Sequence, residues 1–244
     1  MALVLATDDT GGPEIFASLQ GEGPSQGKPC AFVRLSRCNL ACVWCDTPYT
    51  WHFGGDDRPH RGGVTYPRVA NQFTLDEDDV AMCIAALGQP RLVVTGGEPL
   101  LQAPALARML ALLPDAIVEI ETNGTVAPPP ALDALVAQYN VSPKLAHSGN
   151  AAELALVPER LEQWAAEPRA VFKFVVAEPA DVAEVLELAS RFSIPRERVW
   201  LMAEGTDSAT LAAREQWLAP LCIRERLTLS KRLHIDLFGD SRGT

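Results

Sequence analysis

Cys38, Cys42 and Cys45 are separated by three and then by two residues, so three thiols lie in one short loop. Cysteine thiolates hold iron–sulfur clusters, and a [4Fe-4S] cluster normally takes four of them, one per iron. Three cysteines leave one iron without a protein ligand, and an iron with an open coordination position can bind a small molecule. The spacing therefore predicts a [4Fe-4S] cluster that takes part in chemistry rather than one that only passes electrons.

A structural zinc site is the alternative interpretation of these thiols, with Cys30 as the fourth ligand. Structural zinc sites usually pair two short Cys-x2-4-Cys segments, whereas this chain has one crowded segment and a distant Cys30. A disulfide framework is disfavoured, because a chain of 244 residues can bury a core without such links and shows no signal peptide.

The composition limits the classes of function. The chain is 48% hydrophobic and carries 21 Lys and Arg against 31 Asp and Glu, a net charge of −10. An acidic chain without a basic stripe is a poor candidate for binding nucleic acid or an anionic membrane, and no stretch is apolar for long enough to span one. We expect a small-molecule substrate and a cytoplasmic location, where free thiols stay reduced.

Two segments before the cysteines carry polar groups that a ligand could use. Gln20 and Glu22 alternate with glycines in a tight loop that can approach a flat ligand closely, although an ordinary surface turn is the alternative. Residues 31–35 are expected to form a short buried strand that contains Arg34. A buried charge needs a partner, so Arg34 lies either in a salt bridge of the core or opposite an anionic ligand.

Strands and helices alternate along the rest of the chain. The patterns predict helices near 75–87, 100–113, 131–138, 180–192 and 208–218, and strands near 91–94, 116–120, 170–176, 199–202 and 233–238, with one more ending at residue 141. This alternation indicates an α/β fold on a mainly parallel sheet. About six such strands are too few for a closed eight-stranded barrel, so we expect a partial, open β/α barrel.

Residues 49–72 show neither a helical nor a strand period, and we expect a long loop excursion there, with His52 and His60 as solvated loop residues. In folds of this kind the chemistry gathers at the carboxyl ends of the strands. Polar segments at such ends are 38–45, 95–98, 121–123 and 142–144, and Glu204 and His234 have similar positions. We expect these segments to meet in one site.

These residues resemble a known superfamily. The three cysteines resemble the cluster motif of the radical S-adenosylmethionine (SAM) enzymes, and Thr-Gly-Gly-Glu-Pro at 95–99 resembles the edge on which those enzymes seat the methionine part of SAM. Within the superfamily the chain is similar to the 7-carboxy-7-deazaguanine synthases. That similarity is carried by Leu-Gln-Gly-Glu-Gly at 19–23, Cys-Asp-Thr at 45–47, Glu-Thr-Asn-Gly at 121–124, Ser-Pro-Lys at 142–144 and Leu-His-Ile-Asp-Leu-Phe-Gly at 233–239.

The resemblance implies a single radical SAM domain over 1–244, with 49–72 as a variable loop. It also implies a lyase in which an electron from the cluster cleaves SAM to give a 5′-deoxyadenosyl radical. The radical would take a hydrogen from 6-carboxy-5,6,7,8-tetrahydropterin, whose ring then contracts with loss of ammonia. The product would be 7-carboxy-7-deazaguanine, a precursor of queuosine and other deazapurines, and SAM would be regenerated.

Residue roles follow from the same resemblance. The cluster would be held by the catalytic residues Cys38, Cys42 and Cys45. SAM would contact Trp44, Cys45, Asp46, Gly97, Glu98, Ser142, Pro143, Lys144, Met202, Ala203, Glu204 and Gly205, with Glu98 taking its ammonium group. The substrate would contact Leu19, Gln20, Gly21, Glu22, Arg34, Thr95, Glu121 and His234.

The resemblance implies further partners. Thr47 would be the protein ligand of Mg²⁺, a flavodoxin or ferredoxin would donate the electron, and the chain would form a homodimer. A glycyl-radical-activating enzyme is the nearest rival, but it does not account for Gln20, Arg34 or Thr47. A non-catalytic zinc or electron-transfer module would explain the cysteines and leave the polar strand ends without a role.

Overall fold

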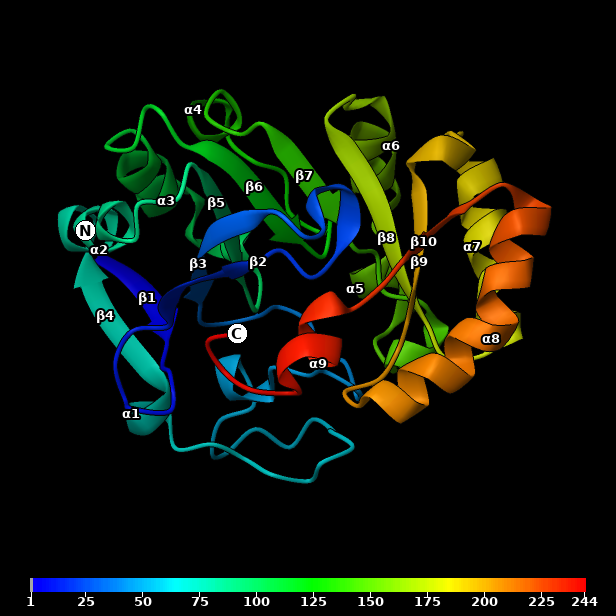
Figure 1. Ribbon diagram of the computed structural model, residues 1–244, viewed down its shortest axis with the longest axis horizontal. Helices are drawn as coiled ribbons and strands as arrows, with labels where there is room; N and C mark the ends of the chain where they lie inside the picture. Colours follow the sequence, from blue (N-terminus) through cyan, green and yellow to red (C-terminus); the bar gives the residue numbers. More distant parts are fainter. Residues whose placement is uncertain (1) are drawn as a thin grey trace.

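A ten-stranded sheet forms the centre of the chain in a computed structural model that describes residues 2–244. The strands follow the order β10-β9-β8-β7-β6-β5-β3-β1-β4, and β2 also pairs with β3 (Figure 1). Their bounds are β1 (Ala2–Ala6), β2 (Ile15–Leu19), β3 (Pro29–Leu35), β4 (Gln72–Asp76), β5 (Arg91–Gly96), β6 (Ile117–Thr122), β7 (Gln138–Val141), β8 (Ala170–Val176), β9 (Val199–Ala203) and β10 (Thr228–Ser230).

The sheet is parallel from β3 through β5 to β10, and antiparallel where β1, β2 and β4 join it. The helices are α1 (Arg68–Asn71), α2 (Glu77–Ala86), α3 (Ala103–Leu110), α4 (Pro130–Asp133), α5 (Ala152–Ala155), α6 (Pro158–Ala166), α7 (Pro179–Arg191), α8 (Ser208–Glu225) and α9 (Leu233–Phe238). Short 3-10 turns are η1 (Gly23–Ser25), η2 (Pro48–Thr50), η3 (Pro99–Gln102), η4 (Ala146–Ser148) and η5 (Arg196–Arg198). The expected open α/β fold with a mostly parallel sheet is confirmed.

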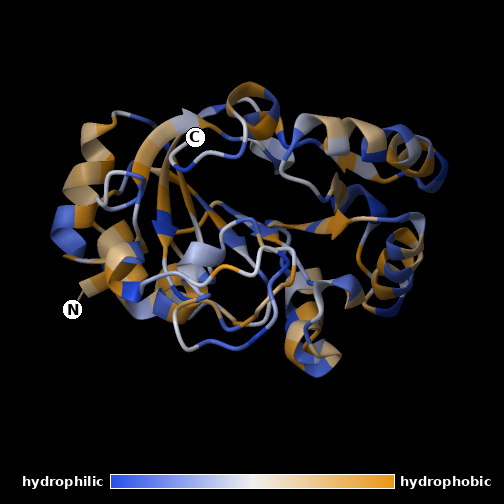
Figure 2. Cartoon of the chain, turned by 90° about the horizontal axis from the view of Figure 1, so that it is seen from below, coloured by the Kyte–Doolittle hydropathy of each residue, from blue (hydrophilic) through white to orange (hydrophobic). Residues whose placement is uncertain are grey.

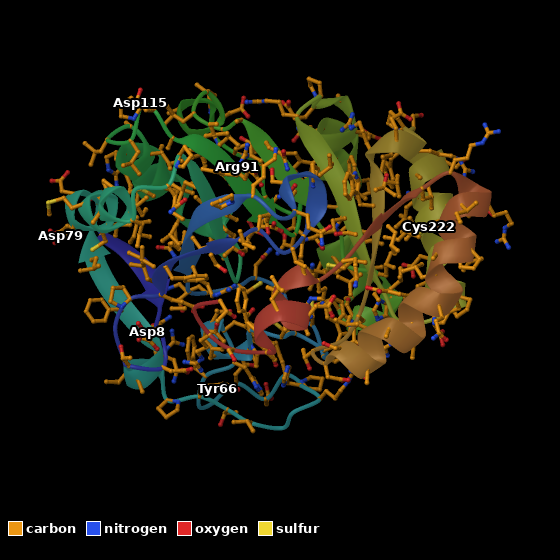
Figure 3. All side chains as sticks on the ribbon, in the orientation of Figure 1. Asp8, Tyr66, Asp79, Arg91, Asp115 and Cys222 are labelled. Atoms are coloured by element: carbon orange, nitrogen blue, oxygen red, sulfur yellow. The ribbon has the colours of Figure 1, made fainter. Side chains whose placement is uncertain are left out.

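Helices cover the outer face of the curved sheet, and Figure 2 shows apolar strands with helices whose polar residues face outward. The core between them contains Tyr139, Phe172 and Phe174, all fully buried. Figure 3 shows the extent of this helical layer, with Asp79 on α2 and Cys222 on α8 at opposite sides of the view. Helix α9 and irregular segments cover the inner face of the sheet. The polar strand ends meet on this inner face.

Local sequence explains where two of the longer helices begin. The side chain of Glu178 accepts a hydrogen bond from the backbone at the start of α7 while Asp181 bonds back to the backbone of Glu178, a reciprocal capping box. Asp207 caps α8 by accepting a bond from the backbone N–H of Thr210 at 2.8 Å. Among residues 2–244, no helix combines the length and the apolar character that a membrane span requires.

Three expectations from the sequence were wrong. The sheet has more strands than the six or so expected, because the strands β1, β2, β4 and β10 were not recognised. Residues 131–138 hold only the end of α4 and the first residue of β7 rather than a full helix. Residues 233–238 form helix α9 and not a final strand, since a short apolar run does not distinguish the two states by its periodicity.

Two glycines bring the end of β5 against the segment that leaves β3. Gly96 has a φ of +141°, and a Cβ atom there would lie 2.0 Å from the carbonyl oxygen of Leu35. A Cβ on Gly97 would lie 2.1 Å from the carbonyl oxygen of Arg37 and 2.9 Å from Cβ of Cys38. Any side chain at either position would therefore push the cysteine loop away from the sheet.

We expect Gly97→Ala to lower the free energy of unfolding by roughly 1–3 kcal/mol, because the added methyl group overpacks a contact with backbone atoms. Urea denaturation followed by circular dichroism measures the change. Gly54→Ala is the matched control, because a Cβ at Gly54 meets no atom within 4 Å. Equal stabilities for wild type and Gly97→Ala would contradict the close packing described for this glycine.

Candidate active site

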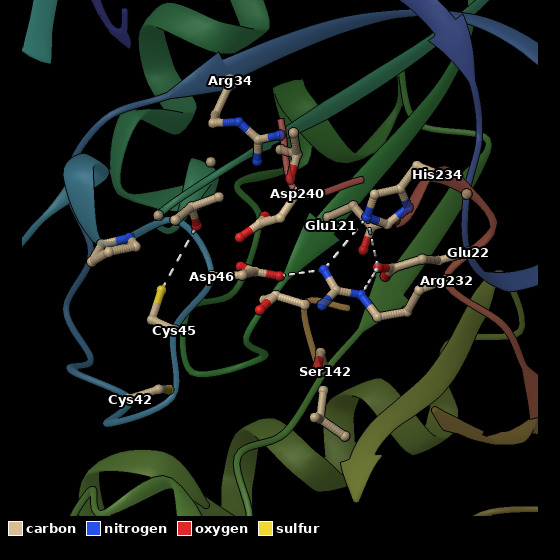
Figure 4. Close-up of a pocket in the computed structure, with 18 of the residues that line it drawn as sticks. Glu22, Arg34, Cys42, Cys45, Asp46, Glu121, Ser142, Arg232, His234 and Asp240 are labelled. Atoms are coloured by element: carbon tan, nitrogen blue, oxygen red, sulfur yellow. Dashed lines mark hydrogen bonds and ion pairs between the residues drawn. The ribbon is translucent and has the colours of Figure 1, made fainter. Parts of the chain in front are cut away.

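A cavity of about 650 Å³ opens on the inner face of the sheet, lined by side chains from the carboxyl-terminal halves of β3, β5, β6, β8 and β9 (Figure 4). Most of the residues predicted to form the site line this cavity: Leu19, Gln20, Gly21, Glu22, Arg34, Cys38, Cys42, Trp44, Cys45, Asp46, Thr47, Thr95, Gly97, Glu121, Ser142, Lys144, Met202, Glu204 and His234. Segments far apart in the sequence thus meet in one place, as the rule of strand ends predicts.

The three cysteines lie together on the cavity wall in the loop that follows β3. The backbone N–H of Cys45 donates to the carbonyl oxygen of Cys42 at 3.0 Å, which folds the loop back on itself. Burial raises the pKa of Cys38 to about 12 and that of Cys45 to about 11, and it also raises the pKa of Cys42. These thiols therefore become thiolates only when a cation binds, since bound iron or zinc deprotonates its thiol ligands.

Cys30 is separate from this set of thiols. It lies on β3 in an apolar contact with Phe32 and Val93, and its Sγ donates to the carbonyl oxygen of Lys28 at 3.3 Å. A four-thiolate zinc site that includes Cys30 is therefore not formed. Three thiols that line one cavity, with Cys42 buried and Cys38 and Cys45 partly exposed, fit a [4Fe-4S] cluster with one iron open to a ligand.

Four predicted SAM contacts, Glu98, Pro143, Ala203 and Gly205, do not line the cavity. The contact between Glu98 and the ammonium of SAM stays a prediction. Glu98 is fully buried, and its carboxylate accepts bonds from the backbone N–H of Asn123 at 2.7 Å, Oγ1 of Thr122 at 2.9 Å and the backbone N–H of Leu100 at 3.0 Å. Burial raises its pKa, and its structural role is to join the ends of β5 and β6.

Arg34 forms the salt bridge that was one of the two alternatives raised by its sequence position. Its Nε donates to Oε1 of the buried Glu14 at 2.7 Å, and the same carboxylate accepts from the hydroxyl of Tyr49 at 3.1 Å. The side chain of Arg34 nevertheless lines the cavity (Figure 4). Burial opposes the charge of Arg34, but Tyr49 and Glu14 outweigh it and raise the pKa of the guanidinium. Arg34 is thus a permanent cation on the cavity wall.

A network of buried charges crosses the floor of the cavity. Nζ of Lys173, on β8, forms ion pairs with Glu22 and, at 2.7 Å, with Glu121. Arg232, which precedes α9, pairs with Glu22 at 3.2 Å and with Asp46. Burial would raise the pKa of Glu22, but Lys173 and Arg232 hold that pKa far below its usual value. The floor therefore offers ionised carboxylates as acceptors.

Lys173 and Arg232 were missed by the sequence analysis. Lys173 stands in the strand Ala-Val-Phe-Lys-Phe-Val-Val, so the reasoning that selected Arg34, a charge within an apolar run, would have found it. Arg232 carries no such signal, because it lies in a polar turn and becomes buried only when the last segment folds back over the cavity.

His234 lies on α9 against the loop that contains Gly21. A Cβ on Gly21 would lie 2.0 Å from Nδ1 of His234, so only glycine allows this contact. Burial lowers the pKa of His234, which favours the neutral imidazole near pH 7. His234 therefore offers one donor and one acceptor rather than a charge.

Trp44 and its neighbours form the opposite wall. The indole stacks on the ring of His147 with centroids 5.4 Å apart, and Nζ of Lys144 lies 5.7 Å from the indole centroid. Lys144 also donates to Oγ of Ser142 at 2.8 Å. Nε1 of Trp44 is buried and has no hydrogen-bond partner among the described residues. An aromatic face with a cation and a spare donor suits a planar, polar ligand.

The excursion after the cysteines packs back on them. Nε2 of His60 lies 2.8 Å from the carbonyl oxygen of Cys45. The backbone N–H of Arg61 donates to the carbonyl oxygen of Val43 at 2.7 Å. His52 is buried, with Nδ1 2.8 Å from the carbonyl oxygen of Val64, so the expectation of a solvated residue was wrong. Arg61 also pairs with Glu204 at 3.1 Å, which ties the excursion to the end of β9.

Comparisons with known proteins agree with this geometry. Residues 33–145 match the model of the Radical SAM superfamily. The chain is similar to the QueE crystal structure from Escherichia coli, with a TM-score of 0.65, 24% identity and 95% of each chain covered. SuiB of Streptococcus suis bound to S-adenosylmethionine matches with a TM-score of 0.51 and 13% identity, over 80% of this chain and 48% of that one. These structures establish a shared fold.

Sequence relatives are more specific. The 7-carboxy-7-deazaguanine synthase of Pyrobaculum aerophilum is 39% identical over 234 residues, which cover 94% of this chain and 95% of the relative. The protein of the same name from Hyperthermus butylicus is 34% identical, over 91% of this chain and 90% of the relative. Identity at this level over nearly the full length of both chains shows that this chain belongs to the 7-carboxy-7-deazaguanine synthase family of the radical SAM superfamily.

Proposed function

We propose that this chain converts 6-carboxy-5,6,7,8-tetrahydropterin to 7-carboxy-7-deazaguanine with loss of ammonia. The observation that carries the proposal is the meeting, in one cavity, of three thiols, the cation Arg34 and the carboxylates Glu22 and Glu121. When bound, the reduced [4Fe-4S] cluster supplies the electron that cleaves SAM and yields the 5′-deoxyadenosyl radical. The residues around it bind and orient the two small molecules.

The charges of the cavity suit the two ends of a carboxypterin. Its amino-pyrimidinone edge is rich in N–H donors, and Gln20, Glu22 and Glu121 supply acceptors on one side of the cavity. Its carboxylate is an anion, and Arg34 supplies a planar fork of donors on another side. Because Nε of Arg34 is held by Glu14, the guanidinium is already oriented before a ligand arrives.

SAM is assigned to the wall formed by Trp44, Asp46, Gly97, Ser142, Lys144, Met202 and Glu204. Trp44 provides a face for the adenine ring, while Lys144 and Ser142 suit the carboxylate of the methionine part. We assign Mg²⁺ to the hydroxyl of Thr47, which lines the cavity 3.7 Å from Sγ of Cys45, with substrate oxygens and water as the other ligands.

Three further parts of the proposal concern the setting of the reaction. The electron donor is a low-potential protein such as a flavodoxin or ferredoxin, and the chain acts as a homodimer. The reaction takes place in a reducing cytoplasm, which is supported by six cysteines that are all free thiols.

The decisive experiment is an anaerobic assay of reconstituted protein with dithionite, SAM, Mg²⁺ and 6-carboxytetrahydropterin, with products identified by mass. We expect 7-carboxy-7-deazaguanine. Formation of 5′-deoxyadenosine without deazaguanine would support radical SAM chemistry and contradict the assigned substrate. A colourless protein that forms neither product would contradict both the radical SAM chemistry and the substrate.

The same assay separates the cluster thiols from the other cysteines. We expect Cys42→Ala to lose bound iron and all SAM cleavage, because Cys42 lines the cavity together with Cys38 and Cys45. Cys30→Ala, the matched control, should keep the brown [4Fe-4S] absorption and full turnover. Loss of the cluster from Cys30→Ala would instead support a four-cysteine site.

Arg34→Lys tests the carboxylate site while keeping a positive charge beside the buried Glu14. Lysine lacks the planar fork of arginine, so the bidentate bond to the substrate is lost. We expect the KM for the pterin to rise by about tenfold, which corresponds to ~1.4 kcal/mol of binding free energy, with kcat and cluster content little changed. Arg108→Lys, in an exposed pair with Glu77, is the control. An unchanged KM in Arg34→Lys would remove Arg34 from the substrate site.

Lys173→Met tests the network on the cavity floor. Without Lys173 the pKa of Glu22 rises toward the ordinary carboxylate value, so ionised Glu22 is lost at a higher pH as the solution is acidified. We therefore expect the acid limb of the pH profile of kcat/KM to move to higher pH. Lys231→Met, whose side chain is 45% exposed and pairs with Asp236, should leave the profile in place. The same acid limb in both variants would contradict the role given to Lys173.

A further inference from the structure

Asn150 contacts the cluster loop and does not line the cavity. Its Nδ2 lies 3.3 Å from Sγ of Cys42, within range for an N–H···S hydrogen bond. A second N–H on the same nitrogen donates to Oγ of Ser148 at 3.1 Å. Its Oδ1 accepts from the backbone N–H of Ala41 at 2.9 Å. The Asn150 amide thus bonds to the cluster loop through one N–H and its oxygen, and to its own segment through the other N–H.

These bonds determine which way the amide faces. The backbone nitrogen of Ala41 can only donate, so it must meet the oxygen of the Asn150 amide. If the amide were reversed, two donors would face each other at Ala41, and a carbonyl oxygen would face Cys42. The N–H of Asn150 is therefore directed at the sulfur of Cys42, because the loop permits no other arrangement.

The segment that carries Asn150 is itself fixed to the loop. The backbone N–H of Val43 donates to the carbonyl oxygen of Ser148 at 2.9 Å. Gly149 has a φ of +76°, and a Cβ there would lie 2.7 Å from Cγ1 of Val43. The cluster loop and the end of η4 are therefore in direct contact over several residues, and Asn150 has little freedom to turn away.

Asn123 also places a side-chain amide near a cluster sulfur, but it differs from Asn150 in two respects. Its Nδ2 is 4.0 Å from Sγ of Cys38 and also donates to Oδ1 of Asn39 at a shorter distance of 2.9 Å. It also lines the cavity, where a ligand competes for its amide, whereas Asn150 does not. Asn150 is thus the side chain best placed to act on a cluster sulfur throughout a reaction cycle.

We propose that Asn150 is a positioning residue that raises the reduction potential of the cluster by donating a hydrogen bond to the Cys42 sulfur. Reduction adds one electron from a low-potential donor to the cluster, so the sulfur ligands become more negative, and no bond or proton is exchanged with the protein. An N–H donor stabilises the more negative state, and hydrogen bonds to sulfur are known to tune such potentials. The inference rests on the cluster of the proposed function and not on its substrate.

The test is a redox titration of the reconstituted protein, with the reduced cluster followed by electron paramagnetic resonance. Asn150→Ala removes the donor, and Asn150→Asp keeps the shape and the acceptor for Ala41 while replacing the N–H with a negative oxygen. We expect both variants to have lower potentials than wild type, with Asn150→Asp the lower. A tenfold smaller equilibrium constant for reduction, about 59 mV for one electron, is the expected scale for Asn150→Ala.

Gln163→Ala is the control, because Gln163 is an exposed amide on α6 whose Oε1 accepts from Arg160, so its loss changes no contact of the cluster loop. Its potential should equal that of wild type. An unchanged potential in both Asn150 variants, or an equal shift in Gln163→Ala, would overturn the inference. If neither Asn150 variant holds a cluster, Asn150 serves retention and not tuning, and the inference is likewise overturned. Absence of a cluster from wild type would instead reject the proposed function.

Discussion

The ion network of Glu22, Asp46 and the buried cations Lys173 and Arg232 is the interaction on which the site depends. Its members come from the loop after β2, from β8, from the segment before α9 and from the cluster loop. Removing one partner would leave a buried charge uncompensated, which is costly in a low-dielectric interior. The network therefore joins three irregular segments to strand β8 of the sheet.

The network also determines the sign of the net charge on the cavity floor. Two cations there face three carboxylates, Glu22, Glu121 and Asp46, so the floor keeps an excess of acceptors. Arg34 stands apart from it, held by Glu14, and gives another wall a positive charge. A cavity that is acidic on one side and basic on the other orients a ligand with a donor-rich edge and a carboxylate, without any large movement of the protein.

Sequence reasoning found most residues of this cavity because their signals are local. Cysteine spacing, glycine pairs and a charge within an apolar strand such as Arg34 can be recognised in a few residues. It failed where the cause lies elsewhere in the fold. Arg232 becomes buried only through the return of the last segment, and 233–238 forms a helix although its apolar run also suits a strand. Strands β1, β2, β4 and β10 were missed for a similar reason, since they are short pieces that the neighbouring strands stabilise.

The path of the last residues has a practical consequence for protein production. After α9 the chain crosses the cavity, and Gly239, Asp240, Ser241, Arg242 and Thr244 all line it. Arg242 is anchored there with its guanidinium 3.6 Å from the ring centroid of Tyr49. An affinity tag fused after Thr244 would therefore begin on the cavity wall and compete with small molecules for space. A tag placed before β1 would begin beside the edge strand β4, and no residue of β1 lines the cavity, so purification handles and fluorescent fusions belong at the amino end of this chain.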